Sequence, residues 1–132
     1  MSTSLLYTYN GIAQTVPATE TQLSLGTIIR RYGKCIDLNG TSINITGPGY
    51  YKITVIVNST LTAAGSTAYK LSANNVQLAS STVTTTGAAE AQSIPLQAVV
   101  RIKCCGDTES ITLSAAGAAG TVDAVSVIVE KL

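Results

Sequence analysis

The chain has 132 residues, of which 11% are charged, and its formal net charge is +1. This length fits one domain that buries a core without disulfides or metal ions to hold it together. The weak charge argues against a nucleic-acid partner, because polyanion binding needs clustered Lys and Arg. Arg30, Arg31 and Lys34 form a small basic cluster, which we interpret as a solvated sheet edge.

The abundant residue types favour strands. Thr and Ser account for 19 and 13 residues, the aromatic residues are six tyrosines, and Phe and Trp are absent. β-Branched residues suit a pleated, half-buried surface and disfavour helices. The first residues show no basic, apolar leader, and no apolar run approaches the length of a membrane span. We therefore expect a soluble all-β protein that is made in a cytoplasm and has no membrane partner.

Period-2 alternation and turn signals divide the chain into short strands. The expected strands are residues 4–9, 22–30, 34–38, 42–46, 50–58, 67–73, 76–83, 93–105, 109–114 and 121–130. The expected turns include Asn39-Gly40, Gly47-Pro48-Gly49 and Asn74-Asn75. The Ala- and Gly-rich segments 62–67, 84–91 and 114–120 are expected to be loops. Many short strands without a helical period predict a two-sheet sandwich or a jelly roll.

The longest alternating segment, residues 93–105, has one apolar and one polar parity. Pro95 belongs near the start or the edge of this strand, because proline cannot donate a ladder hydrogen bond. Cys104 shares the apolar parity and Cys105 the polar one. A bond between these neighbours is disfavoured, since a trans peptide holds their Cα atoms about 3.8 Å apart, closer than disulfides allow.

The sequence allows several states for the third cysteine, Cys35: a disulfide, a free thiol or a metal ligand. Parity makes Cys35 and Cys105 the better pair if a disulfide forms, whereas reduced thiols are the default for a protein made in a cytoplasm. Three cysteines without histidine fall short of a four-ligand zinc site within one chain, although a threefold axis would pool ligands from three chains. We expect no metal and no cofactor.

Catalytic groups are not apparent. Histidine, the commonest general base, is absent. The carboxylates are scattered along the chain: Glu20, Asp37, Glu90, Asp107, Glu109, Asp123 and Glu130. Neither a triad nor a phosphate-binding glycine loop at a strand-to-helix junction is present, so we expect a protein that is not an enzyme.

Several predicted strands carry apolar side chains on both faces, which suggests that each face is packed against other protein. The segments ITVIV (53–57) and VSVIVEKL (125–132) show this pattern, and surface charge is scarce for a free monomer. A homotrimer around a threefold axis would bury the second face and close the assembly. Tyr50 and Tyr51 have opposite parity, so one faces the core and the other an interface or solvent. The candidate core or trimer-contact residues are Tyr50, Tyr51, Ile53, Val55, Val57, Val125, Val127 and Val129.

Ordered motifs carry a family resemblance. They are the turn and strand of residues 47–57, the Leu71–Gln77 hairpin, the strand that ends in Gly106-Asp107, and the valine-rich last strand. In this order they resemble the tumour-necrosis-factor and complement globular-head superfamily of trimeric jelly rolls. The short form, with Arg-Arg-Tyr-Gly, Cys-Cys and a terminal Val-Glu-Lys-Leu, resembles phage-encoded head-fibre or virion decoration proteins. The chain departs from the family in having neither Phe nor collagen-like repeats.

This resemblance implies a homotrimeric, non-enzymatic structural protein of a phage virion surface, made in the cytoplasm of the bacterial host. Residues 1–20 would be an N-terminal strand and attachment segment, and residues 21–132 a single jelly-roll domain. The implied partners are other copies of the chain and phage capsid proteins. The alternative is a carbohydrate- or receptor-binding module of a fibre tip, for which host-surface or mucus glycans would be the ligands.

Overall fold

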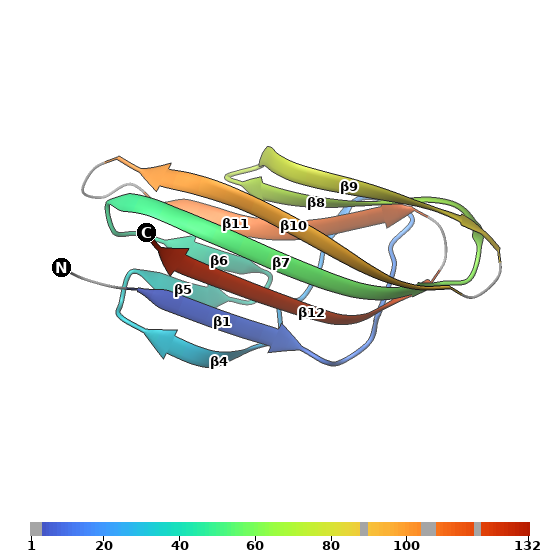
Figure 1. The fold of residues 1–132 in the computed structure, drawn as a ribbon, viewed down its shortest axis with the longest axis horizontal. Coiled ribbons are helices and arrows are strands. Elements are labelled where there is room, and N and C mark those ends of the chain that lie inside the picture. Colours follow the sequence, from blue (N-terminus) through green and yellow to red (C-terminus); the bar gives the residue numbers. More distant parts are fainter. Residues whose placement is uncertain (1–3, 88–89, 104–107, 118–119) are drawn as a thin grey trace.

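The protein is a sandwich of two antiparallel sheets, seen in a computed structural model that describes residues 4–87, 90–103, 108–117 and 120–132 (Figure 1). Sheet A has the order β10 (Glu90–Ile102), β7 (Gly49–Leu61), β12 (Gly120–Lys131), β1 (Leu5–Asn10) and β4 (Thr27–Tyr32), and β2 (Gln14–Thr15) also pairs with β12. Sheet B has the order β5 (Ile36–Asn39), β6 (Ser42–Ile45), β11 (Glu109–Gly117), β8 (Ala64–Ala73) and β9 (Val76–Thr86), and β3 (Thr21–Gln22) also pairs with β11. The predicted all-β, two-sheet architecture is confirmed.

Two of the predicted turns join hairpins in the expected places. Asn74 and Asn75 adopt φ values of 48° and 67°, and Ala73 pairs with Val76 across them. Both central residues of a type I′ turn need positive φ, which Asn tolerates better than most residues. In the β5–β6 hairpin Asn39 pairs with Ser42, and Gly40 has a φ of 64°.

The predicted loops at the Ala- and Gly-rich segments were largely wrong. The structure extends strands into all three segments: β8 begins at Ala64, β9 runs to Thr86 and β11 runs to Gly117. Gly and Ala are depleted in strands, which favoured loops from the sequence alone. At Gly117 an added Cβ would lie 2.3 Å from the Ser66 carbonyl oxygen. At this position glycine is therefore needed because the backbones of β11 and β8 approach closely.

The predicted strand at residues 22–30 is divided between the two sheets. β3 pairs with β11 in sheet B, whereas β4 pairs with β1 in sheet A. The connecting segment buries Leu23 and Leu25, and the Leu23 amide donates a 2.7 Å hydrogen bond to the Leu113 carbonyl. Gly26, with a φ of 83°, turns the chain toward β4. The alternation of Leu23 and Leu25 was therefore real, but it marks a crossing between sheets.

The core lies between the sheets and is formed by the inward parity of nearly every strand. Tyr51 and Tyr69 are fully buried and supply its aromatic volume. The Tyr51 hydroxyl donates to the Gly47 carbonyl at 2.8 Å, and the Tyr69 hydroxyl lies 2.5 Å from the Ser59 Oγ atom. Burial raises the pKa of both phenols, so both stay neutral over the physiological range.

Thr8, in β1, is fully buried, and its Oγ1 atom has no hydrogen-bond partner among the described residues. An unsatisfied buried hydroxyl costs free energy, and Val has nearly the same shape. We therefore expect Thr8→Val to raise the free energy of unfolding by about 1 kcal/mol.

The matched control is Thr85→Val. Thr85 is also buried, but its hydroxyl donates a 2.6 Å hydrogen bond to the Ala63 carbonyl. This substitution should therefore destabilise the protein. Denaturant unfolding of both variants checks the pair, and equal losses of stability would show that Thr8 has a partner in solution.

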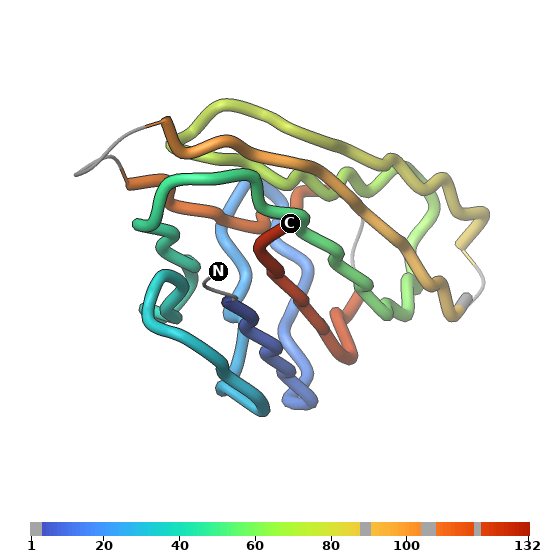
Figure 2. Tube along the Cα trace, turned by 60° about the vertical axis from the view of Figure 1, so that its left-hand side comes forward, coloured from blue at the N-terminus to red at the C-terminus, as the bar shows by residue number. Residues whose placement is uncertain are grey.

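The two ends of the described chain lie together at one end of the sandwich (Figures 1 and 2). The Lys131 amide donates a 2.9 Å hydrogen bond to the Ser4 carbonyl. β1 is an interior strand of sheet A, because β12 and β4 flank it, and its Leu6 is fully buried. The division of the chain at residue 20 stays a prediction, and the structure adds that β1 belongs to the folded sandwich.

Candidate self-association face

The two outer faces of the sandwich differ sharply in composition. On sheet B, cross-strand neighbours are hydroxyl and amide side chains: Ser42, Thr112, Ser72 and Gln77 follow one another across four strands. On sheet A, large apolar side chains point outward from every long strand. We define the apolar face as the outward residues Tyr9, Tyr32, Tyr50, Ile56, Val99 and Ile128.

The centre of the apolar face lies on β7, β12 and β1. Ile56 and Ile128 are 40% and 39% exposed and come from adjacent strands, where Ile128 pairs with Thr54 and Ile56 with Ser126. On the other side of β12, Tyr7 pairs with Ile128 and Tyr9 with Ser126. Two isoleucines and two tyrosine rings thus share a small area, although the sandwich core is already complete beneath them.

The margins of the face carry the remaining apolar residues. Val99, 54% exposed, projects from the edge strand β10 opposite Lys52. Tyr50 pairs with Arg101, and the guanidinium carbon of Arg101 lies 5.6 Å from the centre of the Tyr50 ring. This is the geometry of a cation–π contact.

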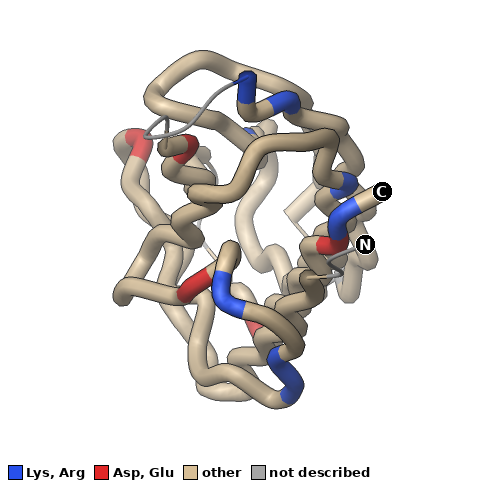
Figure 3. Tube along the Cα trace, turned by 90° about the vertical axis from the view of Figure 1, so that its left-hand side faces the viewer, with Lys and Arg blue, Asp and Glu red and all other residues tan. Residues whose placement is uncertain are grey.

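Charged side chains lie among the apolar residues on the outer side of sheet A. Lys52 on β7 is the cross-strand partner of Glu130 on β12, and Arg30 on β4 is the partner of Tyr7. Figure 3 looks at the end where the termini lie and shows acidic and basic residues distributed around it, with red and blue segments side by side near the C-terminus. A partner that covers the whole apolar face would also cover Arg30, Lys52, Arg101 and Glu130, so association there should combine apolar burial with the pairing of these charges.

The residues that the sequence predicted for the core or the trimer contact fall into two groups, according to the face of the strand on which they lie. Tyr51, Ile53, Val55, Val57, Val125, Val127 and Val129 lie in the core, whereas Tyr50 is 52% exposed on the apolar face. The outward residues Ile56 and Ile128 were not named as candidates. The sequence contained the signal for both, because each lies on the outward side of a segment, 53–57 or 125–132, in which both sides of the strand are apolar.

The structure describes Cys35 but not the other two cysteines. Cys35 is half-buried against the core, and its Sγ atom fills the space beside Gly47. Cys104, Cys105 and the Gly106-Asp107 turn lie outside the described residues. The pairing of Cys35 with Cys105 therefore stays a prediction, which thiol titration of the folded and the denatured protein would test.

Within the described ranges, no three potential metal-binding side chains gather into a cluster. In the same part of the chain, no helix is long and apolar enough to cross a membrane.

Structural comparison identifies the fold. No protein-family model and no curated protein matches the chain. Murine APRIL at pH 8.5 aligns with a TM-score of 0.70 and 15% identity, and the alignment covers 99% of this chain and 100% of that chain. Eiger TNF from S. frugiperda aligns with a TM-score of 0.67 and 10% identity, over 99% of this chain and 92% of that one. The fold is a TNF-like jelly roll.

The same TNF-like jelly roll occurs in a protein of another kind. The PRD1 vertex protein P5 aligns with a TM-score of 0.60 and 12% identity, over 100% of this chain and 99% of that chain. The alignments span the whole chain, including residues 4–20, so β1 is part of the shared fold. The predicted fold and its resemblance are confirmed, and the sequence identities are low enough that the comparison speaks to the fold alone.

Proposed function

We propose that the protein is a homotrimer in which the apolar face of each subunit is covered by its neighbours. The observation that carries this proposal is the contrast between the two outer faces: sheet A exposes isoleucine, valine and tyrosine, whereas sheet B exposes hydroxyls and amides. Large apolar side chains exposed together, as around Ile56 and Ile128 and the tyrosines of β1, mark an interaction site in soluble proteins. The TNF-like neighbours are trimeric, which supports three copies rather than two.

A ring of three also suits the shape of the face. The apolar residues extend from the edge strand β10 to the opposite edge strand β4, across the full width of sheet A. In a closed ring one part of the face contacts one neighbour and another part contacts the other, so the whole width is buried. A twofold dimer would instead require the face to be self-complementary.

We further propose that the trimer is a non-enzymatic structural protein of a phage virion surface, either a head fibre or a capsid decoration. The likeness to the PRD1 phage vertex protein supports this role, because the same fold serves there as a virion component. Its partners would be further copies of the chain and phage capsid proteins. Within residues 1–20, attachment would use the exposed stretch around Ile12, which is 79% exposed, because β1 is held in the sheet.

The experiment that tests this role locates the protein on purified virions. We expect mass spectrometry to detect the chain in the virions, and immunogold electron microscopy to place it on the capsid. Absence from purified virions would overturn the virion role. Label confined to a tail tip would instead favour the alternative, a receptor-binding module.

The tyrosines do not support a sugar-binding site of their own. Tyr51 and Tyr69 are in the core, and the other four project outward from sheet A on three different strands, where self-association would cover them. A glycan-binding function therefore needs another surface.

A further inference from the structure

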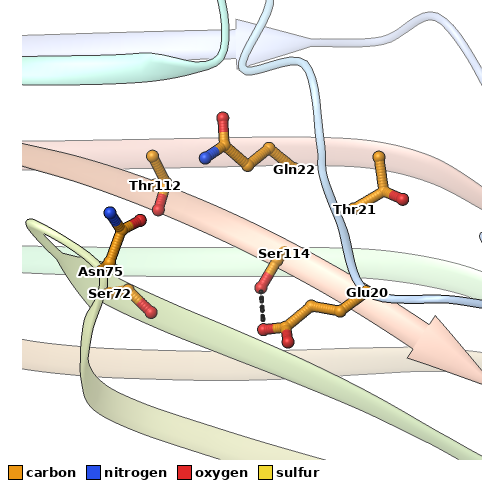
Figure 4. Close-up of a pocket in the computed structure, with 7 residues that line it drawn as sticks. All are labelled: Glu20, Thr21, Gln22, Ser72, Asn75, Thr112 and Ser114. Carbon is orange, nitrogen blue, oxygen red and sulfur yellow. Dashed lines mark hydrogen bonds between the residues drawn. The ribbon is translucent and has the colours of Figure 1, made fainter.

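A polar groove crosses the outer face of sheet B. Two neighbouring hollows of about 300 and 360 Å³ share the side chains of Gln22, Asn75 and Thr112. Figure 4 shows Ser72, Thr112 and Ser114 on the floor, with Gln22 at the top of the view and Asn75 at the left, next to Ser72, so that these side chains border one open space. The polar groove is defined by these five residues and Glu20.

The floor of the groove follows from the register of sheet B. Thr112 on β11 pairs with Ser72 on β8, and Ser114 on the same strand pairs with Gln22 on β3. Outward positions on adjacent strands stand side by side, so their hydroxyls and amides form one continuous floor. The sequence separations are large, and only the jelly-roll topology brings these residues together.

The wall at Asn75 is held rigidly. The Asn74 amide donates to the Ser110 carbonyl at 2.9 Å, and the Ser110 amide donates to the Asn74 Oδ1 atom at 2.9 Å. The Asn74 side-chain amide also donates to the Thr108 carbonyl at 3.2 Å. Three hydrogen bonds thus fasten the β8–β9 turn to β11, so Asn75 is presented by a fixed backbone rather than by a free loop.

The opposite wall is fixed as well. The Thr41 hydroxyl donates to the Gln22 Oε1 atom at 2.8 Å, which leaves the side-chain NH₂ group of Gln22 as a donor. Glu20 is held by the Ser114 hydroxyl at 3.1 Å and by Lys70, whose Nζ atom lies 3.6 Å from the carboxylate. The charge of Glu20 is therefore matched locally, and the groove as a whole is close to neutral.

Hydrogen-bonding capacity at the centre of the groove is unused. The side chains of Ser72, Asn75 and Thr112 make no hydrogen bond to any other described residue, and Ser72 and Thr112 are half-buried. Together they offer hydroxyl and amide groups that both donate and accept. Small-ligand sites are concave and orient the ligand through convergent polar groups; this groove supplies such groups, although the described residues that line it are polar rather than apolar.

The chemistry of the groove selects among ligand classes. A nucleic-acid strand needs clustered cations, and here Lys70 is paired with Glu20. A divalent cation needs several oxygen ligands that include carboxylates, and Glu20 is the one carboxylate that lines the groove. An apolar ligand would leave the hydroxyls unpaired. A ligand that is itself neutral and rich in hydroxyls matches the lining.

We propose that the polar groove binds a neutral saccharide, whose hydroxyls exchange hydrogen bonds with Ser72, Asn75 and Thr112. The groove lies on sheet B, so it stays open when sheet A is covered by self-association. A trimer would present three such grooves, and multivalent attachment would strengthen a weak single-site interaction. The proposal stands whether or not the protein is a virion component.

The test is a titration of the isotope-labelled full chain with neutral oligosaccharides, followed by amide chemical shifts. Maltohexaose, mannohexaose and chitotetraose serve as probes, at up to roughly 10 mM to reach weak affinities. We expect at least one probe to shift the amide signals of Ser72, Asn75 and Thr112. Shifts in none of the three probes, or shifts confined to the apolar face, would overturn the proposal.

Two matched variants sharpen the test. Thr112→Val removes a hydroxyl from the floor and keeps the β-branched shape, and we expect it to weaken binding about 3- to 10-fold, the equivalent of one hydrogen bond. Thr82→Val makes the same change on β9, on the same outer face but outside the groove, and should leave binding unchanged. Equal affinities for both variants would contradict the assignment of the groove.

Discussion

Ile128→Asp is expected to convert the proposed trimer into a folded monomer. Ile128 lies near the centre of the apolar face, next to Tyr7 on β1 and close to Ile56 on β7. In the monomer the new carboxylate would be hydrated, because this position is 39% exposed. In the assembly it would be buried without a partner, which costs about 3–5 kcal/mol at each interface. Such a loss corresponds to roughly 150- to 4,000-fold weaker association.

Sedimentation equilibrium provides the measurement. The unmodified chain should sediment at three times its mass of 13.5 kDa, and the Ile128→Asp variant at the mass of one chain. The control is Val76→Asp, which makes a similar change at another exposed apolar residue, on the sheet B strand β9 and outside the apolar face. This control should remain trimeric. A trimeric Ile128→Asp variant with unchanged circular dichroism would place the subunit contact elsewhere, and a monomeric unmodified chain would end the proposal.

The parts of the fold that the sequence revealed are those in which local pattern and tertiary environment agree. In β10 one parity is buried and the other exposed, as the alternation from residue 93 predicted, and Pro95 lies on an edge strand. The Asn74-Asn75 turn was predictable because few residues tolerate two successive positive φ values. The apolar face was also signalled, since a strand that is apolar on both parities needs cover on both sides.

Other features depend on contacts between distant segments and leave no local pattern. The polar groove combines Gln22, Ser72 and Thr112 from three strands, and Ser and Thr at such positions resemble any solvated surface. The chain crosses from one sheet to the other at Gly26, within residues 22–30, whose alternating apolar and polar residues predicted a single strand. The Ala- and Gly-rich strand ends read as loops, because composition reports propensity and not the close approach that makes small residues necessary.

Gly117→Ala tests that last explanation and should cause the largest loss of stability among these variants. Gly117 has a φ of 148°, which side chains disfavour, and an added Cβ would lie 2.3 Å from the Ser66 oxygen and 2.5 Å from the Thr67 Cα. Its amide also donates to the Pro17 carbonyl at 3.0 Å, so the backbone is held from a second side. Steric overlap and backbone strain together should lower the free energy of unfolding by about 3 kcal/mol or more.

Gly40→Ala separates the steric contribution from the strain. Gly40 also has a positive φ, 64°, but an added Cβ there would meet nothing within 4 Å. It should lose only about 1 kcal/mol, the ordinary cost of a left-handed residue. In thermal unfolding at equal protein concentration, Gly117→Ala should melt at least roughly 10 °C below the unmodified protein, and Gly40→Ala only a few degrees below it. Equal shifts for the two variants would mean that β11 and β8 can separate, and that glycine at 117 serves only its backbone conformation.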